Sequence, residues 1–181
     1  MEHVAVIGAG SWGTAVAALA ARQHPVVLWA RRPNLAEHIN TSSENSEYLP
    51  GYRLPFGLRA TSSLPEATAG ATVLVMAVPS HGFAEVMADI DEVADDLPIV
   101  SLTKGIEEGT LRRMTQVIAD ALPRHRTERI GVLTGPNLAA EVTAGDPTAA
   151  VAAMTDSEAA SVIQRTFMGP TFRVYTNPDV I

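Results

Sequence analysis

A short glycine-rich turn near the amino terminus constrains the fold of this chain more than any other sequence feature. His3 to Ile7 is apolar and rich in β-branched residues, and an alanine-rich stretch that reaches Arg22 follows the turn. These compositions predict a buried strand before the turn and a helix after it. Glycines at positions 8, 10 and 13 have the spacing G-x-G-x-x-G. We therefore expect the chain to begin as a strand, a tight turn and a closely packed helix.

The same three glycines indicate a dinucleotide-binding site. Gly8 permits the tight turn, Gly10 lets the backbone approach a pyrophosphate, and Gly13 lets the helix pack against the sheet. Unpaired N–H groups at the start of the helix, together with the helix dipole, favour a bound diphosphate. A tight turn without a ligand is the alternative. The strand before the motif and the helix after it are the context that dinucleotide binding requires.

The rest of the chain alternates apolar strand segments with helical segments. We expect further strands at 26–29, 72–78, 99–102, 130–133, 149–153 and 172–175. We expect helices after Pro33, from a capping box at Ser63 to Gly70, and at 80–90, 110–122, 138–143 and 157–167. The polar and then proline-rich segment 41–55 predicts a long loop. The pattern predicts an α/β fold, a Rossmann-type domain over residues 1–181 with a doubly wound, mainly parallel sheet of about seven strands.

Charge and composition exclude several classes of partner. The formal net charge of −7 disfavours nucleic acids and anionic membranes, and the absence of cysteine excludes disulfides and thiolate chemistry. The uncharged run from Val4 to Ala21 follows Glu2 and contains three glycines, so we expect no membrane span and a soluble, cytoplasmic protein. Five histidines are scattered without ligand spacing, so no metal site is expected. Four acidic residues form a patch that we interpret as solvated surface: Asp91, Glu92, Asp95 and Asp96.

The residues after the second strand bear on the choice of cofactor. Arg31 and Arg32 stand where NAD-binding domains place an acidic residue, and no carboxylate follows before Glu37. A carboxylate would repel a 2′-phosphate, whereas guanidinium groups pair with it bidentately. We therefore predict that NADP(H) is preferred and that NAD(H) is the second cofactor. Two solvated surface arginines are the alternative interpretation.

Lys104 is the only lysine of the chain, whose other twelve cationic residues are arginines. It follows the strand expected at 99–102, at the carboxyl edge of the sheet, where ligands bind in such folds. A lysine is a compact, mobile charge that can donate hydrogen bonds to a developing alkoxide. Lys104 is thus a candidate catalytic residue, with a solvated loop lysine as the alternative.

Six segments, taken in order, resemble bacterial NAD(P)-dependent glycerol-3-phosphate dehydrogenases. They are Gly8 to Ala15, Asn45 with Tyr48 to Gly51, Ala77 to Ser80, Thr103 to Glu107, Gly135 to Val142, and Tyr175 to Ile181. Each segment is weak alone, but their order and spacing are specific and span essentially the whole chain. The resemblance implies interconversion of dihydroxyacetone phosphate and sn-glycerol 3-phosphate for phospholipid synthesis.

The resemblance also implies roles for individual residues. Ser11, Trp12, Arg31, Arg32 and Ala139 match cofactor contacts, and Lys104 matches a lysine that contacts both cofactor and substrate. Gly135 and Asn137 match substrate contacts, although the family often has serine or threonine at the position of Asn137. The partner implied is a small phosphorylated substrate, and a homodimer of the full-length form stays open.

In the family, the lysine assigned as general acid and base lies on a helix shortly beyond the last of these segments, and much of the phosphate site lies further on, in a helical second domain. We expect that domain to be absent here, so the chain should bind NADPH but turn over little substrate alone. Two other hypotheses remain. One is another dehydrogenase with a Rossmann and a helical domain, such as ketopantoate reductase. The other is a non-catalytic sensor of nicotinamide nucleotides.

Overall fold

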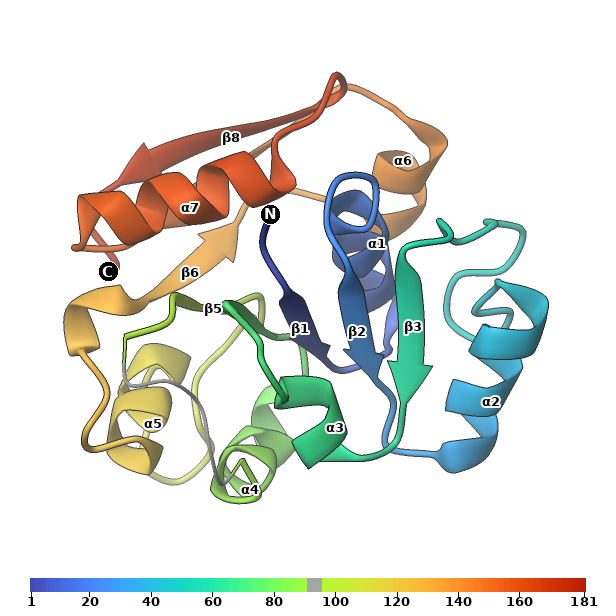
Figure 1. Cartoon of the computed structure of the whole chain (residues 1–181). Helices are drawn as coiled ribbons and strands as arrows, with labels where there is room; N and C mark the ends of the chain where they lie inside the picture. The colour runs from blue at the N-terminus through green and yellow to red at the C-terminus, as the bar shows by residue number, and fades with distance from the viewer. Residues whose placement is uncertain (91–95) are drawn as a thin grey trace.

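Eight strands form one sheet, and helices cover both of its faces (Figure 1). The computed structural model describes residues 1–90 and 96–181, so of the acidic patch expected at 91–96 only Asp96 lies within the described residues. The strands are β1 (Val4–Ile7), β2 (Val26–Trp29), β3 (Leu58–Thr61), β4 (Val73–Met76), β5 (Ile99–Ser101), β6 (Ile130–Thr134), β7 (Thr148–Ala153) and β8 (Phe172–Asn177). The α-helices are α1 (Ser11–Ala20), α2 (Pro33–Ser42), α3 (Leu64–Thr68), α4 (Phe83–Ala88), α5 (Met114–Ala121), α6 (Ala139–Ala144) and α7 (Ser157–Phe167). Short 3₁₀ turns lie at η1 (Ser80–Gly82) and η2 (Thr127–Arg129).

The strand order is β3-β2-β1-β4-β5-β6-β7-β8, as expected for a doubly wound sheet. β1 pairs in parallel with β2 on one side and with β4 on the other, and Ile7 lies opposite Trp29 and Met76. These three strands therefore end at the same level. The winding direction reverses between β1 and β4, and in open α/β sheets this switch point opens a crevice at the carboxyl edge.

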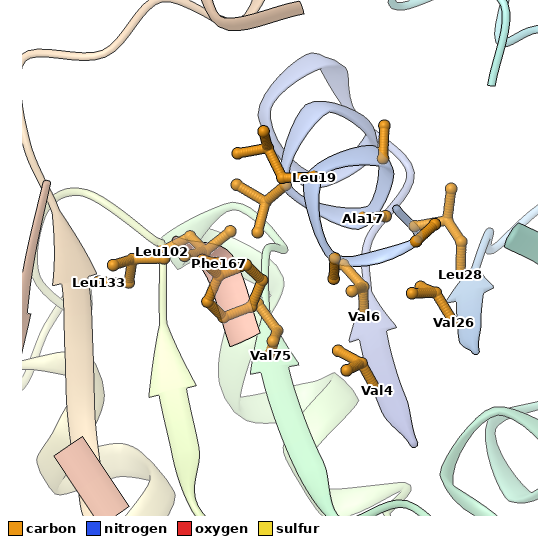
Figure 2. Packing of buried hydrophobic residues seen from close by; sticks show 14 of the residues in the cluster. Val4, Val6, Ala17, Leu19, Val26, Leu28, Val75, Leu102, Leu133 and Phe167 are labelled. Atoms are coloured by element: carbon orange, nitrogen blue, oxygen red, sulfur yellow. The ribbon is translucent and has the colours of Figure 1, made fainter. Parts of the chain in front are cut away.

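The two faces of the sheet carry separate cores because successive strand residues point to opposite sides. Val4 and Val6 belong to the cluster beneath α1, α6 and α7, whereas Ala5 and Ile7 belong to the cluster against α3, α4 and α5. Figure 2 shows the first cluster, in which side chains of α1 lie over β1 and β2 and Phe167 lies beside Val75, Leu102 and Leu133. Strands buried on both faces explain the continuous apolar runs in the sequence.

Three details differ from the expectations. β3 was not predicted, because Leu58-Arg59-Ala60-Thr61 lacks an apolar run, and it makes the sheet eight-stranded. β7 pairs antiparallel with β6 and the other strand pairs are parallel, which confirms the expected mainly parallel sheet but places its one antiparallel pair at a position that the sequence did not predict. Helix α5 begins at Met114 instead of 110, because 106–113 form a turn closed by an antiparallel bridge between Ile106 and Arg113.

The edge strand β3 is bound on its outer side by a side chain of α2. The Asn40 amide donates to the Ala60 carbonyl at 2.8 Å, and its oxygen accepts from the Ala60 N–H at 2.8 Å. Just beyond the carboxyl end of β3, Ser63 caps α3 by accepting from the Glu66 N–H at 3.3 Å. The Glu66 side chain bonds Arg59 and Thr61 instead of returning to Ser63, so only half of the expected capping box forms. No helix within residues 1–90 and 96–181 is long and apolar enough to cross a membrane.

Candidate functional site

A cleft of about 470 Å³ opens at the carboxyl ends of β1, β2 and β4, where the winding of the sheet reverses. Its walls are the turn at 8–10, residues 29–32 at the end of β2, Leu35 of α2, Tyr48 of the long loop, residues 77–79 after β4, and one side of η1 and α4. A volume of this size is typical of sites for small ligands and cofactors. The predicted glycines and arginines Gly8, Gly10, Arg31 and Arg32 thus line one cleft.

The three glycines of the turn have different physical requirements. Gly8 has φ 123°, and a Cβ there would lie 2.6 Å from the Ala77 carbonyl oxygen. A Cβ on Gly13 would lie 2.0 Å from the Gly8 carbonyl oxygen. A Cβ on Gly10 would have no heavy atom within 4 Å. Gly8 and Gly13 therefore let the turn and helix pack, whereas Gly10 leaves open space in the wall of the cleft.

The start of α1 offers backbone donors to that open space. Its first intrahelical hydrogen bond runs from the Thr14 N–H to the Gly10 carbonyl at 2.9 Å. No side chain caps this end of the helix, and its first turn holds no acidic residue. The N–H groups of Ser11, Trp12 and Gly13 consequently have no acceptor within the helix, and the dipole makes this end favourable for an anion.

The side chain of Trp12, an expected cofactor contact, packs away from the cleft. The Trp12 ring is half-buried and tilts against Phe172, with ring centroids 6.5 Å apart. Trp12 is not among the residues that line the cleft, and Ser11 beside it is exposed. Ser11 and Trp12 therefore offer a diphosphate their backbone N–H groups at the start of α1, and the Trp12 side chain takes no part in the cleft.

A buried asparagine ties the long loop to the glycine-rich turn. The Asn45 amide donates to the Ala9 carbonyl at 2.9 Å and to the Thr14 hydroxyl at 2.8 Å. Its side-chain oxygen accepts from the Tyr48 N–H at 3.3 Å, and its carbonyl accepts from the Leu49 N–H at 2.8 Å. The loop is therefore ordered by the same turn that forms the floor of the cleft, and this places Tyr48 in the cleft wall.

The arginines after β2 are exposed and differ in their partners. Arg32 donates to the Glu47 carboxylate, with Nη2 2.5 Å from Oε1, and this hydrogen bond raises the pKa of Arg32 and lowers the pKa of Glu47. Arg31 forms no ion pair with any residue that the structure describes. Glu47 was missed by sequence reasoning, because it stands 15 positions beyond Arg32 in a loop whose course the pattern does not predict.

The predicted substrate residues lie along the same edge of the sheet but outside the cleft. Lys104 is exposed on the loop after β5, and the neighbouring Thr103 hydroxyl donates to the Val78 carbonyl at 2.7 Å. This bond ties the Lys104 loop to the segment after β4 that lines the cleft. Lys104 makes no hydrogen bond or ion pair to the described residues, so its ammonium group is available to a ligand.

Gly135, Asn137 and Ala139 lie between β6 and the first turn of α6. A Cβ on Gly135 would lie 2.7 Å from the Ala149 carbonyl oxygen, so the crossing from β6 to β7 requires glycine there. The Asn137 amide donates to the same Ala149 carbonyl at 2.8 Å, whereas its oxygen is buried and has no partner among the described residues. Ala139 is half-buried at the first residue of α6.

The comparisons with known proteins agree with this geometry. Residues 3–160 match the family described as "NAD-dependent glycerol-3-phosphate dehydrogenase N-terminus". The chain belongs to this family. The NAD-dependent glycerol-3-phosphate dehydrogenase family thus accounts for most of the sheet and for the whole cleft.

Individual relatives give the same family. A Sphingopyxis alaskensis protein named glycerol-3-phosphate dehydrogenase (NAD(P)+) 2 is 49% identical over 98% of this chain and 53% of its own length. A Corynebacterium glutamicum relative is 46% identical over all of this chain and 55% of its own length. The crystal structure of glycerol-3-phosphate dehydrogenase from Coxiella burnetii has a TM-score of 0.88 at 34% identity, over 98% of this chain and 54% of that one.

Two consequences follow from these matches. The chain spans about half the length of the curated glycerol-3-phosphate dehydrogenases that it matches. The family is NAD(P)-dependent, and neither ketopantoate reductase nor a nucleotide sensor is favoured by these findings.

Proposed function

We propose that residues 1–181 form the cofactor-binding half of a cytoplasmic NAD(P)-dependent sn-glycerol-3-phosphate dehydrogenase. The observation that carries the proposal is the cleft at the switch point, where Gly10 leaves room beside the uncapped start of α1. These features suit a diphosphate, because backbone donors and a helix dipole converge on a surface without a side chain. Family membership supports the same assignment.

NADP(H) is the preferred cofactor in this proposal, and NAD(H) is also accepted. Arg31 and Arg32 line the cleft directly after β2, where the adenosine ribose is held in folds of this kind. Their guanidinium groups suit a 2′-phosphate, and Arg31 has no competing ion pair within the described residues. The relatives' name, with NAD(P)+, is compatible with use of both cofactors.

The substrate of the whole enzyme is dihydroxyacetone phosphate, or sn-glycerol 3-phosphate in the reverse direction. When bound, the nicotinamide cofactor supplies the hydride that reduction of a ketone requires. Lys104 supplies a positive charge and N–H donors to the substrate from the loop tied to the cleft wall. Asn137 is the second substrate residue, and its unpaired buried oxygen is an acceptor that a ligand hydroxyl would satisfy.

Titration calorimetry with NADPH and NADH tests the cofactor part of the proposal. The chain should bind NADPH more tightly than NADH, and Arg31→Ala should weaken NADPH binding by roughly tenfold while leaving NADH binding nearly unchanged. Arg22→Ala, in the exposed turn after α1 and outside the cleft, is a charge-matched control. Well-folded protein that binds neither nucleotide would refute the cofactor assignment.

Activity of the full-length protein tests the substrate part. It should oxidise NADPH with dihydroxyacetone phosphate and not with ketopantoate, and Lys104→Met should lower kcat/KM while the fold is kept, because Lys104 is exposed and unpaired among the described residues. Equal activity with ketopantoate would reject the proposed substrate.

A further inference from the structure

The end of β2 has no acidic residue in sequence, yet a carboxylate stands there in space. Glu47 comes from the loop between α2 and β3, and its Oε1 lies 2.5 Å from Nη2 of Arg32. Arg32 and Tyr48, the residue after Glu47, both line the cleft. The Glu47 carboxylate therefore lies at the rim of the proposed ribose site, although no local sequence motif predicts its position there.

The position of Glu47 is determined by buried anchors and not by the ion pair alone. Asn45, two residues earlier, is fully buried and bonds the glycine-rich turn through Ala9 and Thr14. Leu49, two residues later, is 5% exposed. A side chain held between two anchors loses less conformational entropy on pairing than one on a free loop. The Glu47 carboxylate is thus a built part of this rim.

Glu47 would have opposite effects on the two cofactors. A carboxylate at this place accepts a hydrogen bond from the ribose 2′-hydroxyl in NAD-binding domains. The same carboxylate repels a 2′-phosphate and competes with it for the Arg32 guanidinium. Arg31 is free of this competition among the described residues, so the two arginines are not equivalent.

We propose that Glu47 is a specificity-determining residue that restrains the preference for NADP(H) by holding Arg32 and by offering an acceptor to the 2′-hydroxyl of NAD(H). The proposal rests on the cofactor binding proposed above. It assigns Arg31 to the 2′-phosphate and makes Arg32 a residue shared between cofactor and protein. The ratio of the two affinities is then set by a loop residue instead of by the end of β2.

The test is calorimetric titration of wild type and Glu47→Gln with NADPH and with NADH. Glutamine keeps the size and an acceptor oxygen but removes the charge. NADPH affinity should rise roughly two- to fivefold, as expected for an exposed charge interaction, while NADH affinity stays within about a factor of two. Glu37→Gln is the matched control, because Glu37 is an exposed carboxylate on α2 that does not line the cleft.

A second pair of variants examines the route through Arg32. In an Arg32→Ala background, Glu47→Gln should change the NADPH-to-NADH ratio less than it does in wild type, because the competition for the Arg32 guanidinium is gone and only the direct repulsion between the carboxylate and the 2′-phosphate remains. In either background, Glu47→Gln should also change the NADPH-to-NADH affinity ratio less at about 1 M salt, where the Debye length is about 3 Å. A ratio that is the same in Glu47→Gln and wild type, or a change shared equally by both cofactors, would overturn the proposal. Wild-type protein that binds neither nucleotide would instead refute the cofactor assignment itself.

Discussion

Replacing Gly10 by alanine separates the binding role of the glycine-rich turn from its folding role. The backbone of Gly10 has φ −73° and ψ 178°, a conformation that alanine adopts without strain, and an added Cβ meets no heavy atom within 4 Å. Alanine restricts the unfolded chain, which stabilises by about 0.4–1 kcal/mol, but it is a poorer N-cap residue than glycine by a similar amount. The free energy of unfolding should therefore change by less than about 1 kcal/mol.

Cofactor binding should respond quite differently. The new methyl group would occupy the space through which a diphosphate reaches the N–H groups at the start of α1. Losing one charge-assisted hydrogen bond costs about 1.5–3 kcal/mol, which corresponds to a rise in Kd of about 10- to 150-fold. The loss should be equal for NADPH and NADH, because both carry the same diphosphate.

Urea unfolding and calorimetric titration of the same preparations measure the two effects. Gly169→Ala is the control, since a Cβ there also meets no heavy atom and the residue lies outside the cleft. Gly13→Ala should instead lower the free energy of unfolding by at least about 1–3 kcal/mol, because its Cβ would overlap the Gly8 carbonyl oxygen and the turn would have to shift. Gly10→Ala protein with wild-type affinity for both nucleotides would show that the diphosphate does not lie at this turn.

Two further predictions concern stability. Asn45→Ala should lower the free energy of unfolding by about 2–4 kcal/mol, because it removes buried hydrogen bonds to Ala9 and Thr14; a loss below about 1 kcal/mol in urea would contradict the anchoring role. Asp156→Ala should cost about 1 kcal/mol at pH 7, because Asp156 caps α7 by accepting from the Ala159 N–H at 2.9 Å. That hydrogen bond, followed by the charges of nearby arginines, lowers the pKa of Asp156 in the folded state. The stabilisation is therefore present above the ordinary aspartate pKa of about 3.9 and is lost as pH falls through the lower folded-state pKa. The free energies of unfolding of wild type and Asp156→Ala, measured by urea titration from pH 7 to pH 2, should converge at the acid end. A difference that stays constant over this range would rule out the Asp156 carboxylate as its origin.

Sequence reasoning located the elements whose signals are local. β2 and α7 occupy the residues expected for them, because β2 is a continuous apolar run after Pro25 and α7 starts directly after its capping Asp156. β3 was missed, because an edge strand pairs through its backbone and needs few apolar side chains. The late start of α5 depends on a bridge between Ile106 and Arg113, which propensity does not reveal.

In the candidate site, too, the residues with local sequence signals were predicted and the residue placed by long-range contacts was not. Gly8, Gly10, Arg31 and Arg32 were predictable, because they lie within or directly after elements with strong periodicity and meet at one sheet edge. Glu47 was not, because its approach to Arg32 depends on the course of a long loop. The signal that would have placed it is Asn45, a polar residue whose burial ties the loop to the first turn of the fold.

The amide of Asn40 has a consequence for how this domain behaves at high concentration. It forms with Ala60 the two backbone bonds that a ninth strand would otherwise make, each at 2.8 Å. An outermost strand with open donors and acceptors is a template on which other molecules stack into aggregates. One side chain thus shields this rim of the sheet from intermolecular pairing, at the cost of a single residue of α2.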